Sequence, residues 1–413
     1  MKKLLFVLPW LPYPLSAGGN QAMYNNINAV KNDFEVIITY CVSSRCQNEQ
    51  NRKKMEQCLG NVKIVPFIYN PYEKFSSQVT RKIESVVEKV RSKIEGFDYK
   101  CSKMSEVFSV KLGEFASFIA SYVEQNNVDI VQLEMCSCLP YALCLPPHVK
   151  KIFVHHELRY VANELRVQSA GITPVRQANF ELAKILEIGL LNKCDAVVTL
   201  SDTDRQKLIS EGVNAPIYTS FAVVNTETTS CNPNDVNNVL SFIGPATHSP
   251  NYVGIKWFLE NCWDALLSSD PSYRLKIIGK WSEERRKELL STYRNIDFAG
   301  FVPDLAESLN NTVMIVPITI GSGIRMKILE ASSLGVPFVS TTVGAEGLPF
   351  ESGRDCLKGD SPKEFVDAVL KMRDKSLRME FAKNANALVK EKYSMEALRR
   401  NRLEIYEKVM NGE

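Results

Sequence analysis

Residues 317–348 read PITIGSGIRMKILEASSLGVPFVSTTVGAEGL, and this stretch decides the fold. The apolar run Val313–Ile318 predicts a buried strand that leads into a Gly-Ser-Gly loop, and the loop opens directly into a helix. A second apolar strand, Val336–Ser340, and another glycine-rich loop follow. A strand, a crossover helix and a second buried strand form the repeating unit of a parallel α/β sheet.

The Gly-Ser-Gly loop also predicts an anion site. Small residues let backbone N–H groups approach an anion closely, and the dipole of a helix N-terminus adds to the attraction. Two cations beside the loop and one carboxylate a turn later suit a ligand with a diphosphate at one end and hydroxyls nearby, such as a nucleotide-sugar. The predicted ligand-binding residues here are Gly321, Ser322, Gly323, Ile324, Arg325, Lys327 and Glu330.

Short apolar runs alternate with helical patterns along most of the 413 residues, a length that predicts two domains. Runs without alternation indicate strands buried on both faces, and hence doubly wound parallel sheets. The polar segment 225–238 is rich in turn formers and predicts a linker. We therefore expect two Rossmann-like domains facing a cleft, at residues 1–224 and 239–390, followed by a C-terminal helix at 391–413.

Composition narrows the class of protein. With 45% hydrophobic and 23% charged residues the chain is typical of a soluble globular protein, and a net charge of +3 argues against nucleic acid as a partner. Eleven cysteines without CxxC spacing favour a reducing compartment and give little support to a metal or redox role over buried or idle thiols. The apolar start before Pro9 is too short for a signal peptide and is interpreted as a strand. We expect a cytoplasmic protein that needs no cofactor.

Segment 74–115 predicts a basic amphipathic helix, with Ile83, Val86, Val87, Val90 and Ile94 at helical spacing. Such a helix can bind an anionic membrane surface. Interspersed glutamates dilute its charge, so the favoured interpretation is an ordinary surface helix that packs its apolar stripe on the sheet.

Polar residues at predicted strand ends are the candidates for catalysis. His155 and His156 follow the strand that ends at Val154, and Glu157 comes next. Buried parallel strands give no alternation, so the pattern leaves open which histidine faces the cleft; we favour His155. Glu134 follows the strand Ile130–Leu133 and is either a functional carboxylate or an ordinary loop residue. Glu134 and Glu157 could hydrogen-bond an acceptor hydroxyl or orient a histidine.

The first strand is followed by the glycine pair Gly18-Gly19, which opens the helix Met23–Val30. It is either a ligand-binding loop or a tight strand-to-helix turn. Its place at the carboxyl end of the first strand favours binding. The absence of a G-x-G-x-x-G sequence at this point disfavours a dehydrogenase.

Together these segments resemble a retaining glycosyltransferase of the GT-B fold, in the family-4-type group that assembles bacterial polysaccharides and glycoconjugates. The resemblance is strongest over residues 239–348, where VLSFIG, Asn251, LKIIG, FAGFVPD and GSGIRMKILEA follow one another in the family's order. It implies that Glu330 binds the nucleotide ribose and that a histidine such as His155 contacts the donor sugar. It also places the Gly18-Gly19 loop beside the donor phosphate and the acceptor.

The resemblance further implies binding positions around the nucleobase and diphosphate, at Gly244, Gly279, Lys280, Phe301 and Val302, although Phe301 could equally be core. The chain departs from the family in two places. Ser322 stands where many relatives have a glutamate, and the cations expected after the strand Val239–Ile243 are missing, with Asn251 at the matching lysine position. Arg325 or Lys327 is therefore expected to neutralise the diphosphate.

The function expected from this resemblance is transfer of a sugar from a nucleotide-diphosphate sugar to a hydroxyl of a glycan or lipid-linked acceptor, with retention and without a metal. Two alternatives stay open: a GT-B sugar-nucleotide 2-epimerase, and a non-catalytic GT-B scaffold.

Overall fold

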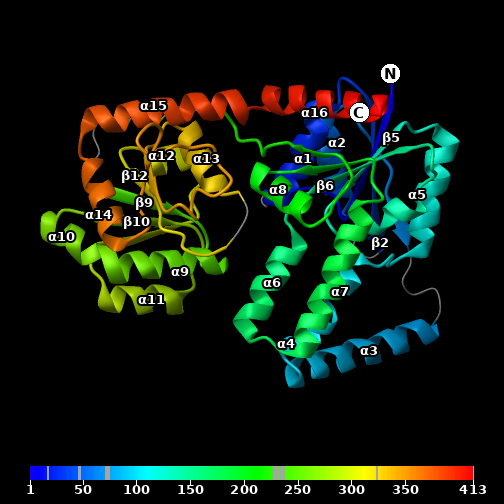
Figure 1. Ribbon diagram of the computed structural model, residues 1–413, viewed down its shortest axis with the longest axis horizontal. Coiled ribbons are helices and arrows are strands. Elements are labelled where there is room, and N and C mark those ends of the chain that lie inside the picture. Colours follow the sequence, from blue (N-terminus) through cyan, green and yellow to red (C-terminus); the bar gives the residue numbers. More distant parts are fainter. Residues whose placement is uncertain are drawn as a thin grey trace. The chain divides into compact units, whose positions relative to one another are not determined.

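The computed structural model describes residues 1–15, 18–44, 48–69, 75–226, 231, 238–321 and 324–412. The chain forms two compact units (Figure 1). Unit 1 contains Met1–Phe221 together with Leu398–Glu413, and unit 2 contains Ala222–Ala397. Each unit is a parallel β-sheet with helices packed around it, so the predicted class of two parallel-sheet α/β domains is confirmed.

Unit 1 is built on a parallel sheet of order β3-β2-β1-β5-β6-β7-β8, with β4 paired to β2. β1 is an inner strand of this sheet, between β2 and β5, and its residues Leu4 to Leu8 are at most 1% exposed. Such complete burial explains why the strand sequences are continuously apolar. The strands are β1 (Lys3–Leu8), β2 (Glu35–Ser43), β3 (Lys63–Ile64), β4 (Phe67–Tyr69), β5 (Ile130–Glu134), β6 (Lys150–His155), β7 (Ala196–Thr199) and β8 (Ile217–Thr219).

Helices connect and cover these strands. They are α1 (Gly18–Val30), α2 (Glu49–Leu59), α3 (Phe75–Ile94), α4 (Phe97–Ser102), η1 (Met104–Phe108), α5 (Gly113–Asn126), η2 (Leu139–Cys144), α6 (Arg159–Ala170), α7 (Pro174–Leu191) and α8 (Asp202–Ser210). The helix expected at Met23–Val30 begins five residues earlier, at Gly18, so the glycine pair forms its first turn.

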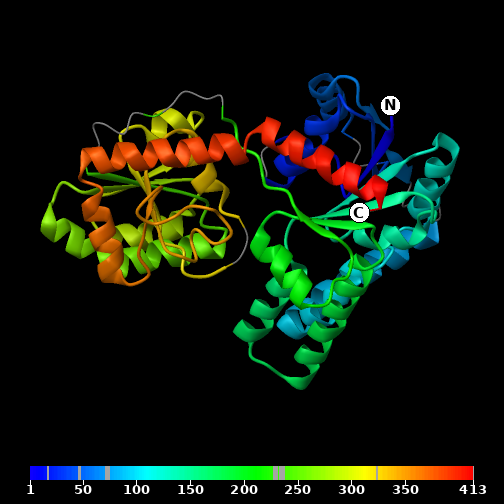
Figure 2. The ribbon, with the colours of Figure 1, turned by 45° about the horizontal axis from the view of Figure 1, so that its top comes forward.

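The C-terminal helix α16 (Met395–Asn411) returns to unit 1 and is drawn in red in Figure 2. Arg402 and Tyr406 are fully buried there. Arg402 Nη2 donates to Oδ1 of Asn26 on α1 over 3.0 Å, and the Tyr406 hydroxyl donates to Oε1 of Gln132 on β5 over 2.6 Å. The Tyr406 ring also meets Phe34 edge-on. The last helix is therefore part of the core of unit 1.

Unit 2 has a parallel sheet of order β11-β10-β9-β12-β13-β14. Its strands are β9 (Val239–Ile243), β10 (Arg274–Ile278), β11 (Ile296–Gly300), β12 (Val313–Val316), β13 (Phe338–Ser340) and β14 (Leu357–Lys358). Its helices are α9 (Ser249–Phe258), η3 (Leu259–Trp263), α10 (Asp264–Ser269), α11 (Glu283–Thr292), α12 (Leu305–Leu309), α13 (Met326–Ser333), α14 (Pro362–Lys371) and α15 (Lys375–Lys392). The two-residue strand β14 carries no apolar run and was not predicted.

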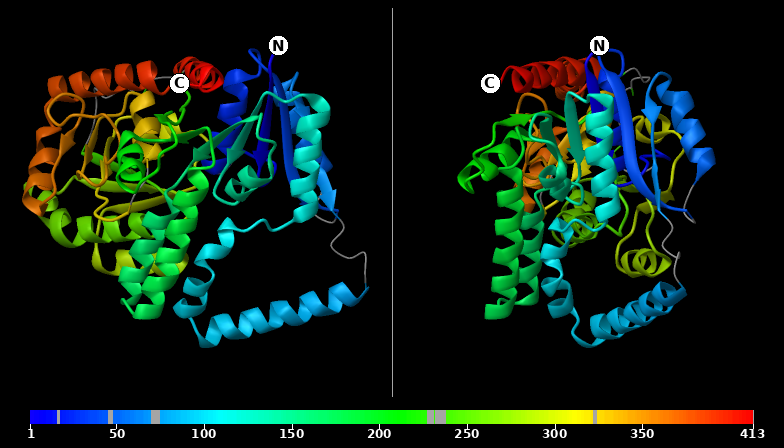
Figure 3. Two further views of the ribbon diagram at one scale, coloured as in Figure 1. Left: turned by 45° about the vertical axis from the view of Figure 1, so that its right-hand side comes forward. Right: turned by 90° about the vertical axis from the view of Figure 1, so that its right-hand side faces the viewer.

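One expectation about packing was wrong. The structure does not place the apolar stripe of α3 on the sheet: Ile83, Val86, Val87, Val90 and Ile94 are between 48% and 78% exposed. Figure 3 shows α3 lying apart from the sheet of unit 1, beyond α4. Among the described residues, no helix is both long enough and apolar enough to cross a bilayer.

Parts of the sequence predictions lie outside the described residues. These are Ser322 and Gly323 of the glycine loop, most of the expected linker, and Ser16 and Ala17 before the first helix. The side chains of α3 before Ile83 are likewise outside the description.

Candidate functional site

In unit 2, the ammonium group of Lys327 lies at the turn that follows β9. Lys327 Nζ donates to Oδ1 of Asn251 over 2.7 Å, and it lies 4.1 Å from the centroid of the Phe242 ring. The amide nitrogen of Asn251 in turn donates to the carbonyl oxygen of Pro245 over 2.9 Å. A lysine from α13 thus occupies the end of a strand that has no cation of its own.

This arrangement requires a glycine at position 244. Gly244 has a φ of 146°, and a Cβ there would lie 2.5 Å from Nδ2 of Asn251 and 2.9 Å from Nζ of Lys327. Its carbonyl oxygen accepts a 2.9 Å hydrogen bond from the Trp281 indole. Gly279 is constrained as well, because a Cβ there would lie 2.7 Å from the Gly244 carbonyl carbon. The two predicted glycines therefore let backbone and side chains meet closely at this sheet edge.

Burial shifts the titration of the charged groups on and beside α13. Burial, with a smaller contribution from the nearby Arg325, lowers the pKa of Lys327 to about 7. Burial also lowers the pKa of Arg325, against a smaller opposing effect of Glu346. Burial raises the pKa of Glu330, and Lys327 partly offsets that rise. A site that disfavours its own positive charges in this way gains from binding an anion.

Arg325 stands at the N-cap position of α13 and is 7% exposed. Its Nη2 donates to the carbonyl oxygen of Gly321 over 3.0 Å, across the glycine loop. Gly321 has a φ of 101°, a conformation that favours glycine, and Ile324 and Glu330 are half-buried. The described part of the predicted loop thus comes together with Arg325 and Lys327 at the start of one helix.

The remaining predicted positions of unit 2 differ in exposure. Lys280 is exposed and its carbonyl oxygen accepts from the Ala246 backbone N–H over 3.1 Å, beside the Gly244 turn. Phe301 is 88% exposed, so it is not a core residue, and Val302 is half-buried. These residues follow β10 and β11 on the same sheet as β9.

In unit 1, Glu134 ends β5 and is fully buried. Its Oε1 accepts from Gln132 over 2.6 Å and from Asn26 over 3.0 Å, and its Oε2 bonds Nε2 of His156. Both carboxylate oxygens are therefore engaged, and His156, which is half-buried, is held by one ring nitrogen. Through Asn26 this network continues to Arg402.

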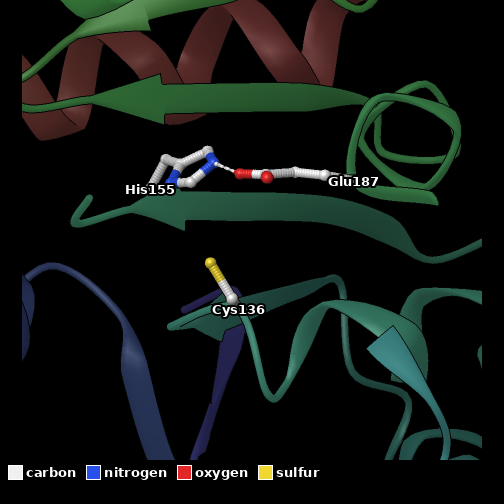
Figure 4. Close-up of side chains that lie close together, drawn as sticks. All are labelled: Cys136, His155 and Glu187. Atoms are coloured by element: carbon white, nitrogen blue, oxygen red, sulfur yellow. Dashed lines mark hydrogen bonds and ion pairs between the residues drawn. The ribbon is translucent and has the colours of Figure 1, made fainter. Parts of the chain in front are cut away.

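His155 lies deeper, at 2% exposed, and bonds a carboxylate that sequence reasoning missed. Its Nε2 donates to Oε1 of Glu187 over 2.8 Å, as Figure 4 shows. Glu187 also accepts the backbone N–H groups of Arg159 and Tyr160, over 2.9 and 2.8 Å, at the start of α6. Glu187 thus anchors His155 and the N-terminus of α6 together.

Cys136 directs its sulfur toward this pair, and ligand atoms of Cys136, His155 and Glu187 lie within 4.8 Å of one another (Figure 4). Burial raises the pKa of the Cys136 thiol. Both Glu187 oxygens already accept hydrogen bonds from His155 and from the backbone at the start of α6, so the carboxylate of this cluster is occupied by donors of the chain.

Glu157 and the glycine pair complete the predicted set. Glu157 is exposed and ion-pairs with Arg159 at 4.0 Å, so it does not join either histidine cluster described above. Gly18 and Gly19 form the first turn of α1, and a Cβ at Gly19 would lie 3.0 Å from the Met135 methyl group. Gly19 thus brings α1 close to the residue after Glu134.

Sequence reasoning missed several buried polar residues of unit 1, among them Asn26, Gln132, Glu187 and Arg402. A signal existed for Glu187, because it occupies the apolar stripe of α7 with Phe180, Ala183 and Leu190. A charged residue in such a position is seldom buried without a partner. The partners themselves lie up to 376 positions apart in the chain and cannot be paired by spacing.

Comparison with solved structures finds the same architecture. HepE of Anabaena, solved in complex with UDP, has a TM-score of 0.67 and 14% identity, over 99% of this chain and 100% of that one. TarM of S. aureus has a TM-score of 0.67 and 13% identity, over 100% and 99% of the two chains. Identities this low show the fold alone.

Two further comparisons concern sequence. The chain is 20% identical to an uncharacterised 44.6 kDa protein in the cps region of Klebsiella pneumoniae, over 95% of this chain and 97% of the other. Residues 237–375 match the family model described as glycosyl transferases group 1. This range contains the Gly244 turn and the start of α13. Residues 237–375 therefore belong to the glycosyl transferases group 1 family, and the whole chain has the two-unit GT-B fold.

Proposed function

We propose that this protein transfers a sugar from a nucleotide-diphosphate sugar to a hydroxyl of a glycan or lipid-linked acceptor, with retention at the anomeric carbon. The main support for binding of the nucleotide-sugar donor is the position of Lys327. Its ammonium group lies at the Gly244 turn, bonded to a neutral amide, with Arg325 bound to the adjacent glycine loop. Two cations at the start of one helix suit a diphosphate.

In this proposal Arg325 and Lys327 stabilise the charge that develops on the leaving diphosphate. Electrostatic stabilisation by prepositioned groups contributes most when those groups are partly shielded from water, as both are here. Glu330, one turn along α13, is proposed to accept hydrogen bonds from the ribose hydroxyls. The positive charge comes from the chain itself, so we propose transfer without a metal and expect chelators to leave the rate unchanged.

UDP-sugars are the first donors to examine. HepE has been solved in complex with UDP and with UDP-glucose. On this similarity we propose uridine as the nucleoside of the donor for this chain. Retention and the class of acceptor rest on the family resemblance.

For unit 1 we propose His156, rather than His155, as the imidazole that meets the substrates. Both oxygens of Glu134 are engaged and one of them holds His156, so Glu134 acts as a positioning residue. His155 is buried against Glu187 and is proposed to stabilise the fold. No role in catalysis is proposed for Glu157, which is on the surface.

We also propose that α3 binds the anionic surface of a membrane, so that a cytoplasmic protein meets a lipid-linked acceptor. The exposed apolar stripe of α3 is bordered by Lys89 and Lys93, and five basic residues against two acidic ones lie within Phe75–Ile94. A helix with these two features suits the interface between headgroups and acyl chains. Val90→Glu should abolish sedimentation with phosphatidylserine vesicles, while Val110→Glu, also at an exposed valine, should not.

If α3 instead pairs with a second copy of the chain, Val90→Glu would convert a dimer to a monomer in gel filtration. In that case vesicles would have no effect on sedimentation of the unmodified protein. That outcome would contradict the membrane proposal.

The donor proposal is tested by thermal shift with UDP-glucose and by UDP release in the presence of a mixture of oligosaccharides. We expect stabilisation of the native state by the bound ligand. Lys327→Met should raise the Kd for UDP-glucose at least about tenfold, which corresponds to a loss of about 1.4 kcal/mol of binding free energy. Lys363→Met, at an exposed lysine of α14, is the matched control. An unchanged Kd in Lys327→Met would contradict the proposal.

A further inference from the structure

Unit 1 contains a cavity of about 590 Å³ that lies outside the Glu134–His156 network. Its wall comes from the loop after β1, the carboxyl halves of β2 and β4, the start of α2 and the segment before α5. Cavities of roughly 300–1,000 Å³ at the carboxyl ends of parallel strands are where α/β units bind small molecules. Neither the donor site nor the two histidine clusters uses this cavity.

Five aromatic side chains line the cavity: Trp10, Tyr13, Tyr40, Tyr69 and Tyr141. Tyr40 and Tyr141 are buried, whereas Trp10 is 48% exposed. An aromatic ring presents a flat apolar face, while phenol and indole edges carry hydrogen-bonding groups. A pyranose ring is matched to such a wall, because one face of the sugar presents C–H groups and its rim presents hydroxyls.

The exposed Trp10 ring is held in place before any ligand arrives. Its Nε1 donates to Oδ1 of Asn20 over 2.8 Å, and the amide nitrogen of Asn20 donates to the carbonyl oxygen of Pro14 over 2.8 Å. Both bonds tie the loop after β1 to the first turns of α1. A large apolar ring that is half-exposed and yet fixed by a hydrogen bond is suited to serve as a stacking platform, because little rotamer freedom is lost on binding.

The polar lining, as far as the structure describes it, consists of neutral groups and Lys111. Ser43, Asn48 and Asn51 provide hydroxyl and amide groups that both donate and accept, as sugar hydroxyls require. Among the described residues that line the cavity, Lys111 is the one that carries a charge. Its ammonium group offers an acidic ligand a favourable charge.

We infer that this cavity binds a pyranose residue of the acceptor glycan, stacked on Trp10, and that Lys111 gives it a preference for a sugar that carries a carboxylate. The inference rests on the proposed function in so far as the bound sugar is the acceptor. The binding itself does not require the donor site, which lies in the other unit. The proposed acceptor, a glycan or lipid-linked compound, is thereby narrowed to one that presents a saccharide, with uronic acids bound more tightly than neutral hexoses.

Trp10 makes the test direct, because it is the only tryptophan of unit 1; the other three, Trp257, Trp263 and Trp281, belong to unit 2. The full chain is titrated with methyl glucuronide and with methyl glucoside while tryptophan fluorescence and saturation-transfer NMR are recorded. We expect saturable binding of both sugars, tighter for the glucuronide, and a loss of at least about tenfold in Trp10→Ala. Lys111→Met should remove the preference for glucuronide and keep glucoside binding, whereas Lys54→Met, at an exposed lysine of α2 outside the cavity, should change neither.

Unchanged sugar affinity in Trp10→Ala would overturn the inference, as would tighter binding of uridine monophosphate or a short isoprenol than of either sugar. Slow hydrolysis of UDP-glucose by the unmodified protein, measured without sugar, separates the two proposals. Hydrolysis without saturable sugar binding would support the donor site and refute the saccharide pocket. Sugar binding that depends on Trp10, in a protein that neither binds nor hydrolyses any nucleotide-sugar, would support the pocket and refute the proposed transfer.

Discussion

Lys327 and Asn251 are 76 positions apart in the chain, yet Nζ of the lysine donates a 2.7 Å hydrogen bond to the amide oxygen of the asparagine. The family pattern places a lysine after the first strand of this unit, and here the position holds Asn251. The neutral amide of Asn251 does not replace the missing charge. It accepts a hydrogen bond from Lys327, which lies on α13. The cation is therefore present at the strand end, although it comes from a different element.

The first prediction concerns the pH dependence of donor binding. The pKa of Lys327 is lowered to about 7 in the unliganded protein, and a bound diphosphate favours the charged ammonium and raises that pKa. Binding then takes up a proton above pH 7, so affinity for UDP-glucose should fall by up to about tenfold per pH unit between pH 7 and 9. Below pH 7 the ammonium is already charged and Lys327 contributes no further dependence.

Titration calorimetry in buffers of different ionisation enthalpy measures this proton uptake directly. UDP-glucose is the suitable probe because it has no terminal phosphate that titrates in this range. Lys327→Met should bind weakly and with no proton uptake at pH 8. Equal proton uptake in the two proteins would show that another group titrates.

The second prediction concerns Gly244→Ala. The new Cβ would lie 2.5 Å from Asn251 Nδ2 and 2.9 Å from Lys327 Nζ, in addition to the strain of a positive φ. Gly353→Ala is the matched control, because Gly353 has a φ of 88° and a Cβ there meets nothing within 4 Å. We expect a loss of about 1–2 kcal/mol in the control and a larger loss in Gly244→Ala, together with loss of UDP-glucose binding. Urea unfolding measures the stability losses and thermal shift measures UDP-glucose binding. Equal stability losses in the two variants would show that the close contacts of the new Cβ with Asn251 and Lys327 do not cause the destabilisation.

The third prediction concerns Glu187→Ala. This buried carboxylate accepts three hydrogen bonds, from His155 and from the backbone of Arg159 and Tyr160. Its removal leaves two buried donors and one partly buried donor without an acceptor and should lower the free energy of unfolding by about 3–5 kcal/mol. Glu181→Ala, at an exposed position of the same helix, should change it by less than about 0.5 kcal/mol. Similar unfolding midpoints for the two variants would contradict the anchoring role.

The fourth prediction separates the two histidines. His156→Asn should keep the unfolding midpoint and lower kcat by about 10²-fold or more, because His156 is half-buried and held by Glu134 alone among the described contacts. His155→Asn should lower the unfolding midpoint, because it breaks the buried bond to Glu187. A fully active His156→Asn protein with native stability would exclude His156 from the reaction.

The sequence predicted the fold class and most strands because buried parallel strands are continuous apolar runs, as in Leu4–Leu8 and Val313–Val316. It did not predict β14, a two-residue strand paired at an edge of the sheet. It also misjudged the packing of α3, because helical spacing of apolar residues does not show which partner, if any, covers that face.

For the site, the sequence located the glycine loop, Arg325 and Lys327, since strand, loop and helix start are contiguous. Their proposed roles stay predictions. The sequence could not decide between His155 and His156, because neighbouring residues of a strand buried on both faces look alike. Nor could it pair Lys327 with Asn251 or His155 with Glu187, because those contacts are set by the tertiary fold rather than by local spacing.

The return of α16 to unit 1 has a consequence for synthesis on the ribosome. Asn26 and Gln132 emerge early, but their partners Arg402 and Tyr406 are translated only after the whole of unit 2. Unit 2 can therefore complete its core while unit 1 still exposes the groove that α16 will fill. Unit 1 is therefore translated first but completes its core last. A chain that stalls or is cleaved before residue 398 leaves the core residues of unit 1 that contact α16 uncovered.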